Sequence, residues 1–244
     1  MSKAIETGHA KNVANFLDLI TFCQAYGVAY NPVKDSLKIP QLQSMHVSAN
    51  EVLNTAKVQK TKFDNATNER RIEFDVLKPL VTRIVNAFAV SGVNSLALDD
   101  LRSVNNKLQG SGPKKSTVPP ENAEPAPQSI STSQQSYDMQ IANFTTLVQL
   151  LEQYPAYNPN EDDLKLEKLQ SKLEGLKSMN FNLIKAYTDY NNSLIQRNVV
   201  LYDPLTGLVQ ISKEVKQYVK SLFGAKSPQF RQVSGLEFKK YYKD

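Results

Sequence analysis

The amino-acid sequence predicts an all-α fold: an elongated four-helix-type bundle made of two tandem three-helix repeats, short–long–short, with pseudo-two-fold symmetry. Three observations predict it. Only 9 of the 244 residues are glycine, and long stretches lack both glycine and proline. Apolar residues recur at helical spacing within these stretches. The second half of the chain also repeats the first in the same order, which is typical of a duplication.

The repeat is clearest in two segments that lie 127 positions apart. AYNPVKDSLKIPQLQS begins at residue 29 and AYNPNEDDLKLEKLQS begins at residue 156. Similar pairs precede and follow them, such as NVANFLDLI with QIANFTTLV and LVTRIVNAFAVSG with LVQISKEVKQYVKSLFG. We therefore expect repeat 1 at residues 1–110 and repeat 2 at residues 137–244.

Between the repeats, residues 111–136 are rich in proline and serine. The stretch from residue 110 to residue 136 holds five of the twelve prolines and almost no large apolar side chain. Such a composition cannot bury enough surface to offset the entropy of ordering. The sequence therefore predicts a linker.

The first helix of repeat 1 is expected at residues 11–26, and its counterpart follows residue 140. Both end at a Tyr-Asn-Pro corner, because proline lacks a backbone donor and disfavours helix in the residue before it. A second helix without glycine or proline follows at residues 41–78, with apolar residues in alternating steps of three and four. This heptad pattern predicts a long helix that packs along a partner.

The third helix of each repeat is expected after a chain reversal, at Pro79 in repeat 1 and at the DPLTG turn of residues 203–207 in repeat 2. In this arrangement any cross-section of one repeat contains two helices. Two helices cannot enclose a core, whereas four can. We therefore expect the two repeats to share one core.

The side chains needed for most catalytic designs are missing from the sequence. The two histidines, His9 and His46, have no counterpart in the other repeat; His9 is expected to be exposed and His46 to lie at a boundary. The single cysteine, Cys23, lies on an apolar stripe and is interpreted as a core residue. There is no glycine-rich phosphate loop, no GxSxG motif and no CxxC pair. We expect no enzyme activity, no catalytic residues, no cofactor and no bound metal.

One polar group recurs in both repeats. Arg70 and Arg197 occupy matching positions, near Asn65 and Asn192, and heptad counting places both arginines on or beside the apolar seam. A buried arginine needs a carboxylate or carbonyl partner. We interpret the four residues as a polar layer that fixes helix register. The alternative is an anion or ligand site at the centre of the bundle.

The C-terminal segment mixes aromatic and basic residues, a pattern that can bind single-stranded nucleic acid or an anionic surface. The alternative is that the segment packs back on the bundle. Its candidate partner-binding residues are Phe230, Arg231, Phe238, Lys239, Lys240, Tyr241 and Tyr242.

The charge and composition of the chain limit the expected cellular location and the expected partners. The net charge is +5, with basic and acidic residues mixed in both halves, so there is no concentrated nucleic-acid-binding block. The start lacks the apolar core of a signal peptide, and no run of about 18 apolar residues exists to cross a bilayer. We expect a cytoplasmic protein without a transmembrane segment.

The YNP corner, the long heptad helix, the run DPLTGLV followed by VKSLFG, and the segment SPQFRQVSGLEF resemble uncharacterised duplicated all-helical proteins of Bacteroidetes-type bacteria. The resemblance covers most of the chain. It implies a helical fold, and it implies no activity and no catalytic residue.

Three functional hypotheses follow. The first is a non-enzymatic structural or protein-interaction helical bundle that binds a protein partner or assembles with itself. The second is binding of nucleic acid or an anionic surface through the C-terminal segment, which salt would weaken. The third is a membrane-active helical bundle, which requires an exposed apolar hairpin that the sequence does not contain.

Overall fold

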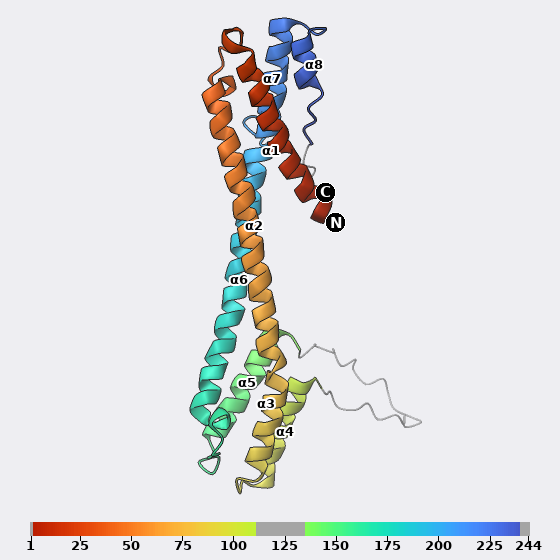
Figure 1. Cartoon of the computed structure of the whole chain (residues 1–244). Helices are drawn as coiled ribbons and strands as arrows, with labels where there is room; N and C mark the ends of the chain where they lie inside the picture. The colour runs from red at the N-terminus through yellow and green to blue at the C-terminus, as the bar shows by residue number, and fades with distance from the viewer. Residues whose placement is uncertain (1, 111–134, 240–244) are drawn as a thin grey trace, which may run out of the picture. The chain divides into compact units, whose positions relative to one another are not determined.

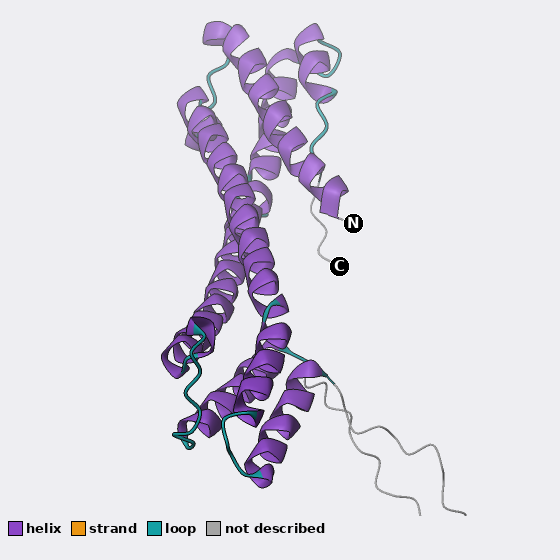
Figure 2. Ribbon diagram, turned by 60° about the horizontal axis from the view of Figure 1, so that its bottom comes forward, coloured by secondary structure: helices purple, strands orange, loops and turns teal. Residues whose placement is uncertain are grey.

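The computed structural model describes residues 2–110 and 135–239, with side chains from residue 8 onward. These residues form α-helices and short 3-10 turns without any β-strand, which confirms the all-α class (Figures 1 and 2). The α-helices are α1 (Ser2–Ala25), α2 (Ile39–Asp75), α3 (Leu77–Ala89), α4 (Ser95–Gln109), α5 (Tyr137–Glu152), α6 (Leu166–Tyr202), α7 (Leu208–Phe223) and α8 (Pro228–Ser234). The 3-10 turns are η1 (Gly27–Ala29), η2 (Asp35–Leu37) and η3 (Asp162–Leu164).

The chain folds into two compact units, and each unit combines residues from both halves of the sequence. Unit 1 comprises Met1–Phe63 and Ala186–Asp244, and unit 2 comprises Asp64–Lys185. The helices α2 and α6 contribute to both units, because the unit boundaries fall within them. Most of the predicted linker, residues 111–134, lies outside the described residues.

In unit 1, α1 packs against α7 and α8, and α7 also packs against η2. Phe16 and Leu19 of α1 are fully buried with Val215 of α7 and Val233 of α8. Burying one such side chain contributes about 1.5–3 kcal/mol. The core of unit 1 therefore joins a helix from the first half of the sequence to two helices from the second.

In unit 2, the two halves of the sequence contribute helices in the opposite proportion. Here α4 packs against α3 and α5, so two helices from the first half meet one from the second. Phe88 of α3, Leu101 of α4 and Phe144 of α5 are fully buried in this core together with Leu169 of α6. Each unit thus contains one helix that precedes a YNP corner and the two shorter helices that follow the long helix of the other half.

The YNP corners lie where the sequence predicts, between α1 and α2 and between α5 and α6. The tyrosine of each motif is buried, and its hydroxyl donates to the carbonyl of the last residue of the 3-10 turn that precedes the long helix. The distance is 2.8 Å both from Tyr30 Oη to Leu37 O and from Tyr157 Oη to Leu164 O. The repeated tyrosine therefore fastens each corner to the approach of the following long helix.

The third helix does not follow a chain reversal at Pro79, and this expectation is wrong. Only Val76 separates α2 from α3, and its φ of −81° and ψ of −9° are helical. Pro79 lies in the first turn of α3, where its missing N–H is tolerated. Figure 1 shows α3 following the end of α2 in the same general direction. This is why α3 meets α5 of the other half.

The number of helices also differs from the expectation of three in each repeat. The first half contains α4 and the second half contains α8, each as an additional fourth helix. Asn94 caps α4 by accepting from Ala97 N, and Ser227 caps α8 by accepting from Phe230 N. The additional helices cover α3 and α7, respectively.

Candidate functional site

Arg70 lies in unit 2, where its guanidinium group contacts an amide side chain and an aromatic ring. Its Nη1 donates to Asn180 Oδ1 at 2.8 Å, and its guanidinium carbon lies 3.9 Å from the centre of the Tyr137 ring. Asn180 in turn donates through Nδ2 to Asp138 Oδ1 at 2.7 Å. Among the residues that the structure describes, the buried Nε of Arg70 has no hydrogen-bond partner. Arg70 therefore links α2 to α5 and α6, and Asn180 connects it to the carboxylate of Asp138.

Arg197 lies in unit 1 and is only 4% exposed. Its Nε and Nη2 donate to Asn198 Oδ1 at 3.3 and 3.1 Å. Asn65 and Asn192, which the sequence places beside the arginines, are exposed and so do not lie in a buried layer. The two arginines thus belong to different units and have different partners.

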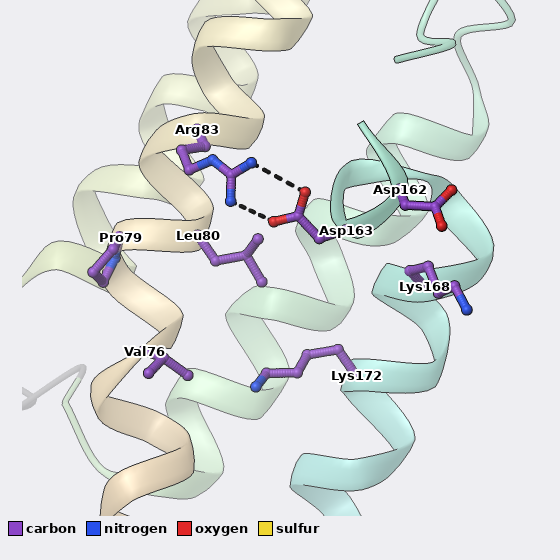
Figure 3. A pocket seen from close by; sticks show the side chains of 8 residues that line it. All are labelled: Val76, Pro79, Leu80, Arg83, Asp162, Asp163, Lys168 and Lys172. Carbon is purple, nitrogen blue, oxygen red and sulfur yellow. Dashed lines mark hydrogen bonds and ion pairs between the residues drawn. The ribbon is translucent and has the colours of Figure 1, made fainter. Parts of the chain in front are cut away.

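A hollow of about 520 Å³ lies on unit 2. Figure 3 shows the side chains that line it. One wall comes from the α2–α3 junction and the other from η3 and the first turns of α6. The lining residues are Val76, Pro79, Leu80, Arg83, Asp162, Asp163, Lys168 and Lys172. They include no His, Cys, Ser, Thr or Tyr, so the lining offers an apolar floor and charged side chains but no imidazole, thiol or hydroxyl.

Four of the charged side chains in this hollow form ion pairs, either with each other or with residues just outside it. Arg83 binds both carboxylate oxygens of Asp163, and this hydrogen bonding lowers the pKa of Asp163 below its ordinary value. Asp162 pairs with Lys165 at 2.6 Å, which lowers the pKa of Asp162. Lys172 pairs with Glu73. The hollow therefore presents little uncompensated charge to a ligand.

A second hollow of about 590 Å³ lies on the other side of Arg83 in unit 2. The YNP corner of residues 156–161 forms one wall, and Asn86, Val90 and Ser91 contribute to the other. Tyr157 lines it with its hydroxyl already bound to Leu164 O, and burial raises the pKa of Tyr157 to about 12. That hydroxyl stays protonated and serves the corner.

The described part of the C-terminal segment packs on unit 1. Phe230 and Phe238 are half-buried against the core of this unit, whereas Arg231 and Lys239 are exposed. Lys220 lies over the Phe230 ring at 5.8 Å and Lys216 over the Phe238 ring at 5.2 Å. The other candidate partner-binding residues, Lys240, Tyr241 and Tyr242, lie outside the described residues.

His9 is buried rather than exposed, contrary to the expectation from the sequence. Its Nδ1 lies 2.6 Å from Tyr202 Oη, and Asn12 Nδ2 donates to the same hydroxyl at 3.3 Å. Cys23 is a core residue as predicted, and burial raises the pKa of its thiol to about 12, with an opposing hydrogen bond from Tyr30. The thiol therefore stays protonated, which makes it a poor nucleophile.

Sequence analysis did not identify the exposed apolar side chains of α6. Phe181 is 66% exposed and Ile184 57%, both in unit 2; Ile195 is 62% exposed and Val199 57%, both in unit 1. The signal was available as apolar residues three and four apart beside the heptad seam. The heptad pattern identifies only the buried side of a long helix such as α6.

Comparison with family models, curated proteins and solved structures finds no match for this chain. Among residues 2–110 and 135–239, no helix combines the length and apolar character needed to cross a membrane. Within that same part of the chain, His, Cys, Asp and Glu side chains form no group of three that could hold a metal ion.

Proposed function

We propose that this protein is a non-enzymatic helical protein that assembles with further copies of itself through the outer face of α6. The observation that carries the proposal is the exposure of Phe181 and Ile184 in unit 2, at 66% and 57%. Large apolar side chains that lie together on an otherwise polar surface are typical of protein interaction sites. We call these two residues the outer residues of α6.

The spacing of the outer residues supports a helix as the binding partner. At about 100° per residue, positions 181 and 184 of an α-helix fall about 60° apart. Phe181 and Ile184 are three residues apart, so they lie on adjacent turns of one helix face. Such pairs are the anchors by which a helix packs against another helix.

The order of the outer residues supports a second copy as that partner. In two antiparallel α6 helices that cross between residues 182 and 183, Phe181 of each copy lies opposite Ile184 of the other. A two-fold symmetric interface needs this self-complementarity, because the same residues serve both partners. The face is therefore suited to a symmetric dimer.

Sedimentation of the full-length chain over the micromolar range tests the proposal. We expect the wild type to dimerise with rising concentration and the Phe181→Gln, Ile184→Gln double variant to stay monomeric. Gln keeps good helix propensity, so the change removes apolar area without breaking α6. The matched control is the Val33→Gln, Leu205→Gln variant, which removes two exposed apolar side chains outside the helices and should dimerise like the wild type.

A wild type that remains monomeric over this range would overturn the proposal. Equal loss of association in the control would also overturn it, because the effect would then be general surface polarity and not the outer residues of α6.

We further infer that the two halves are duplicated repeats with pseudo-two-fold symmetry. Support comes from α2 and α6, which are both 37 residues long and begin 127 positions apart, at Ile39 and Leu166. The tyrosine–carbonyl bonds of the two corners have the same 127-residue offset and the same length. An ancestral symmetric dimer would explain why each unit draws on both halves.

The other hypotheses have less support. Binding of nucleic acid through Phe230 and Phe238 would need both rings to be free for stacking, and both pack against unit 1. A membrane-active bundle would need a contiguous apolar hairpin, whereas the outer residues of α6 alternate with polar ones. A cytoplasmic location and the absence of a cofactor belong to the same proposal of a non-enzymatic assembly protein.

A further inference from the structure

Residues 236–239 follow α8 outside any helix and run along α1 within unit 1 (Figure 1). We call this segment the strap. The carbonyls of Leu236, Glu237 and Lys239 and the amide of Lys239 are bound by side chains of α1 and α7. This is how proteins hold an extended peptide, so the strap can be analysed as a bound ligand.

Two asparagines of α1 bind the strap backbone. Asn12 Nδ2 donates to Lys239 O at 2.9 Å, and Lys239 N donates to Asn12 Oδ1 at 2.8 Å. One side-chain amide thus satisfies both backbone groups of one residue. Asn15 Nδ2 donates to Glu237 O at 2.6 Å. Since the Asn12 side chain is fully buried, losing its two bonds to Lys239 would leave a buried amide without these partners, which is costly.

A lysine of α7 binds the strap from the other side. Lys216 Nζ donates to Leu236 O, lies 3.4 Å from Ser234 O, and sits over the Phe238 ring. Burial lowers the pKa of Lys216, which shows that the ammonium is partly withdrawn from water at this position. The strap is therefore held by hydrogen bonds from α1 on one side and from α7 on the other.

Side chains of the strap alternate between the core and solvent. Leu236 and Phe238 pack against the core of unit 1, whereas Glu237 and Lys239 are exposed. On α1, the Lys239 side chain lies beside Gly8, with its Cδ 3.7 Å from where a Cβ would stand. Gly8, Asn12 and Asn15 are spaced to share one helix face. We call the site formed by this face and Lys216 the strap groove; the sequence Leu-Glu-Phe-Lys of residues 236–239 occupies it.

We propose that the strap groove is a peptide-binding site for an extended Leu-x-Phe-Lys segment, which the chain's own strap fills in cis and the strap of a second copy can fill in trans. The one ligand seated on the groove is this chain's own sequence, which identifies a second copy as the occupant that the groove fits. Exchange of straps would leave every contact of the groove intact.

The cis strap has the advantage of its tether. A short connection gives an effective concentration on the order of millimolar, so a strap in trans competes poorly while the cis strap is intact. Removing the Phe238 ring weakens the cis strap without changing the groove. The groove should then become available to an added peptide.

The test measures binding of a fluorescent peptide, SGLEFK (residues 234–239), to the full-length chain by polarisation. We expect the Phe238→Ala chain to bind this peptide at least about tenfold tighter than the wild type does, because its cis competitor is weakened. Adding Asn12→Ala to the Phe238→Ala chain should abolish binding. A peptide in which Ala replaces the Phe should not bind either chain.

Two controls keep the result interpretable. Circular dichroism reports whether Phe238→Ala remains helical, and Leu236→Ala serves as a second host if it does not. The Phe181→Gln, Ile184→Gln variant, combined with Phe238→Ala, should bind the peptide unchanged, since the strap groove does not involve α6's outer residues. The proposal is overturned if neither host binds SGLEFK, or if binding is insensitive to the peptide's Phe or to Asn12.

Discussion

Units 1 and 2 hold the same tyrosine in the same way but cover it differently. Tyr30 and Tyr157 each donate to a carbonyl seven residues later at 2.8 Å. Tyr157 meets the fully buried Phe88 of α3, whereas Tyr30 meets the half-buried Tyr218 of α7. The structure of each corner therefore depends on contacts within the repeated sequence. The helix that packs on the corner, in contrast, comes from the other half of the chain.

The units also differ in the segment that is bound by the first helix of each half, α1 in unit 1 and α5 in unit 2. In unit 1, Asn12 of α1 binds the strap that follows α8. In unit 2, the residue that aligns with Asn12 is Gln140 of α5, and its Nε2 donates to Gln135 O at 2.9 Å. Gln135 itself donates to Lys107 O at the end of α4. The same position thus binds the segment that follows α8 in unit 1 and the segment that precedes α5 in unit 2.

The largest difference should appear when the covering ring is removed. Phe88→Ala should lower the free energy of unfolding of unit 2 by about 3–5 kcal/mol, because it opens a cavity in a fully buried site. Tyr218→Ala should cost unit 1 less, since Tyr218 is half-buried. Hydrogen exchange resolved by residue during urea denaturation separates the two units. Equal losses would contradict the difference in burial.

A smaller effect should follow from removing either corner hydroxyl. Tyr157→Phe and Tyr30→Phe each leave a buried carbonyl without its donor, at a cost of about 1–3 kcal/mol. The two variants should lose similar stability, because each hydroxyl donates to its carbonyl at 2.8 Å. Urea denaturation of both variants measures these losses. A Tyr157→Phe chain as stable as the wild type would show that the corner bond is not a structural fastening.

The fold class and the long helices could be predicted from the sequence because their signals are local. In α2 the heptad pattern includes Leu42, Ala49 and Ala56, and all three are buried. In α6 the same steps run through Leu183, Tyr187 and Tyr190 and predict a buried Tyr187, which is instead 53% exposed although it contacts Phe63 at 5.5 Å. A heptad fitted over 37 residues drifts from the 3.6-residue repeat.

Other features depended on tertiary structure or on weak patterns. Helix α4 carries a buried stripe of Ala97, Leu101, Val104 and Leu108, a pattern of steps of four, three and four that could have revealed it. The direction of α3 could not be predicted, because Pro79 is compatible both with a reversal and with a first helical turn. The strap groove was hidden because amides that bind backbone, such as Asn12, have no sequence signature.

The smallest effect should come from the exposed ion pairs beside the corners. Hydrogen bonding to Arg83 lowers the pKa of Asp163, and hydrogen bonding to Lys34 lowers that of Glu214. A lowered folded pKa stabilises the protein above the unfolded pKa, and this stability is lost as pH falls through the folded value. Both contributions should therefore fade below the ordinary values of 3.8 for Asp163 and 4.5 for Glu214.

Asp163→Asn should thus flatten the acid dependence of unit 2 slightly, and Glu214→Gln should do so in unit 1. Exposed pairs contribute little, so the shift in urea midpoint between about pH 6 and about pH 3, the range in which carboxylates titrate, should be small. An unchanged slope in both variants would show that these pairs do not form in solution.

The central claim is that each unit is built from both halves of the sequence. The ends of the intervening segment are adjacent in unit 2, since Gln135 Nε2 lies 2.8 Å from Lys107 O, so the covalent link is not needed to position α5. The most direct measurement is to produce residues 1–110 and 135–244 as separate chains and mix them. We predict that neither chain alone folds cooperatively as a monomer, and that mixing gives a 1:1 complex with a single sharp increase in helicity and thermal stability. Two halves that each melt cooperatively as monomers, with no gain on mixing, would contradict the account.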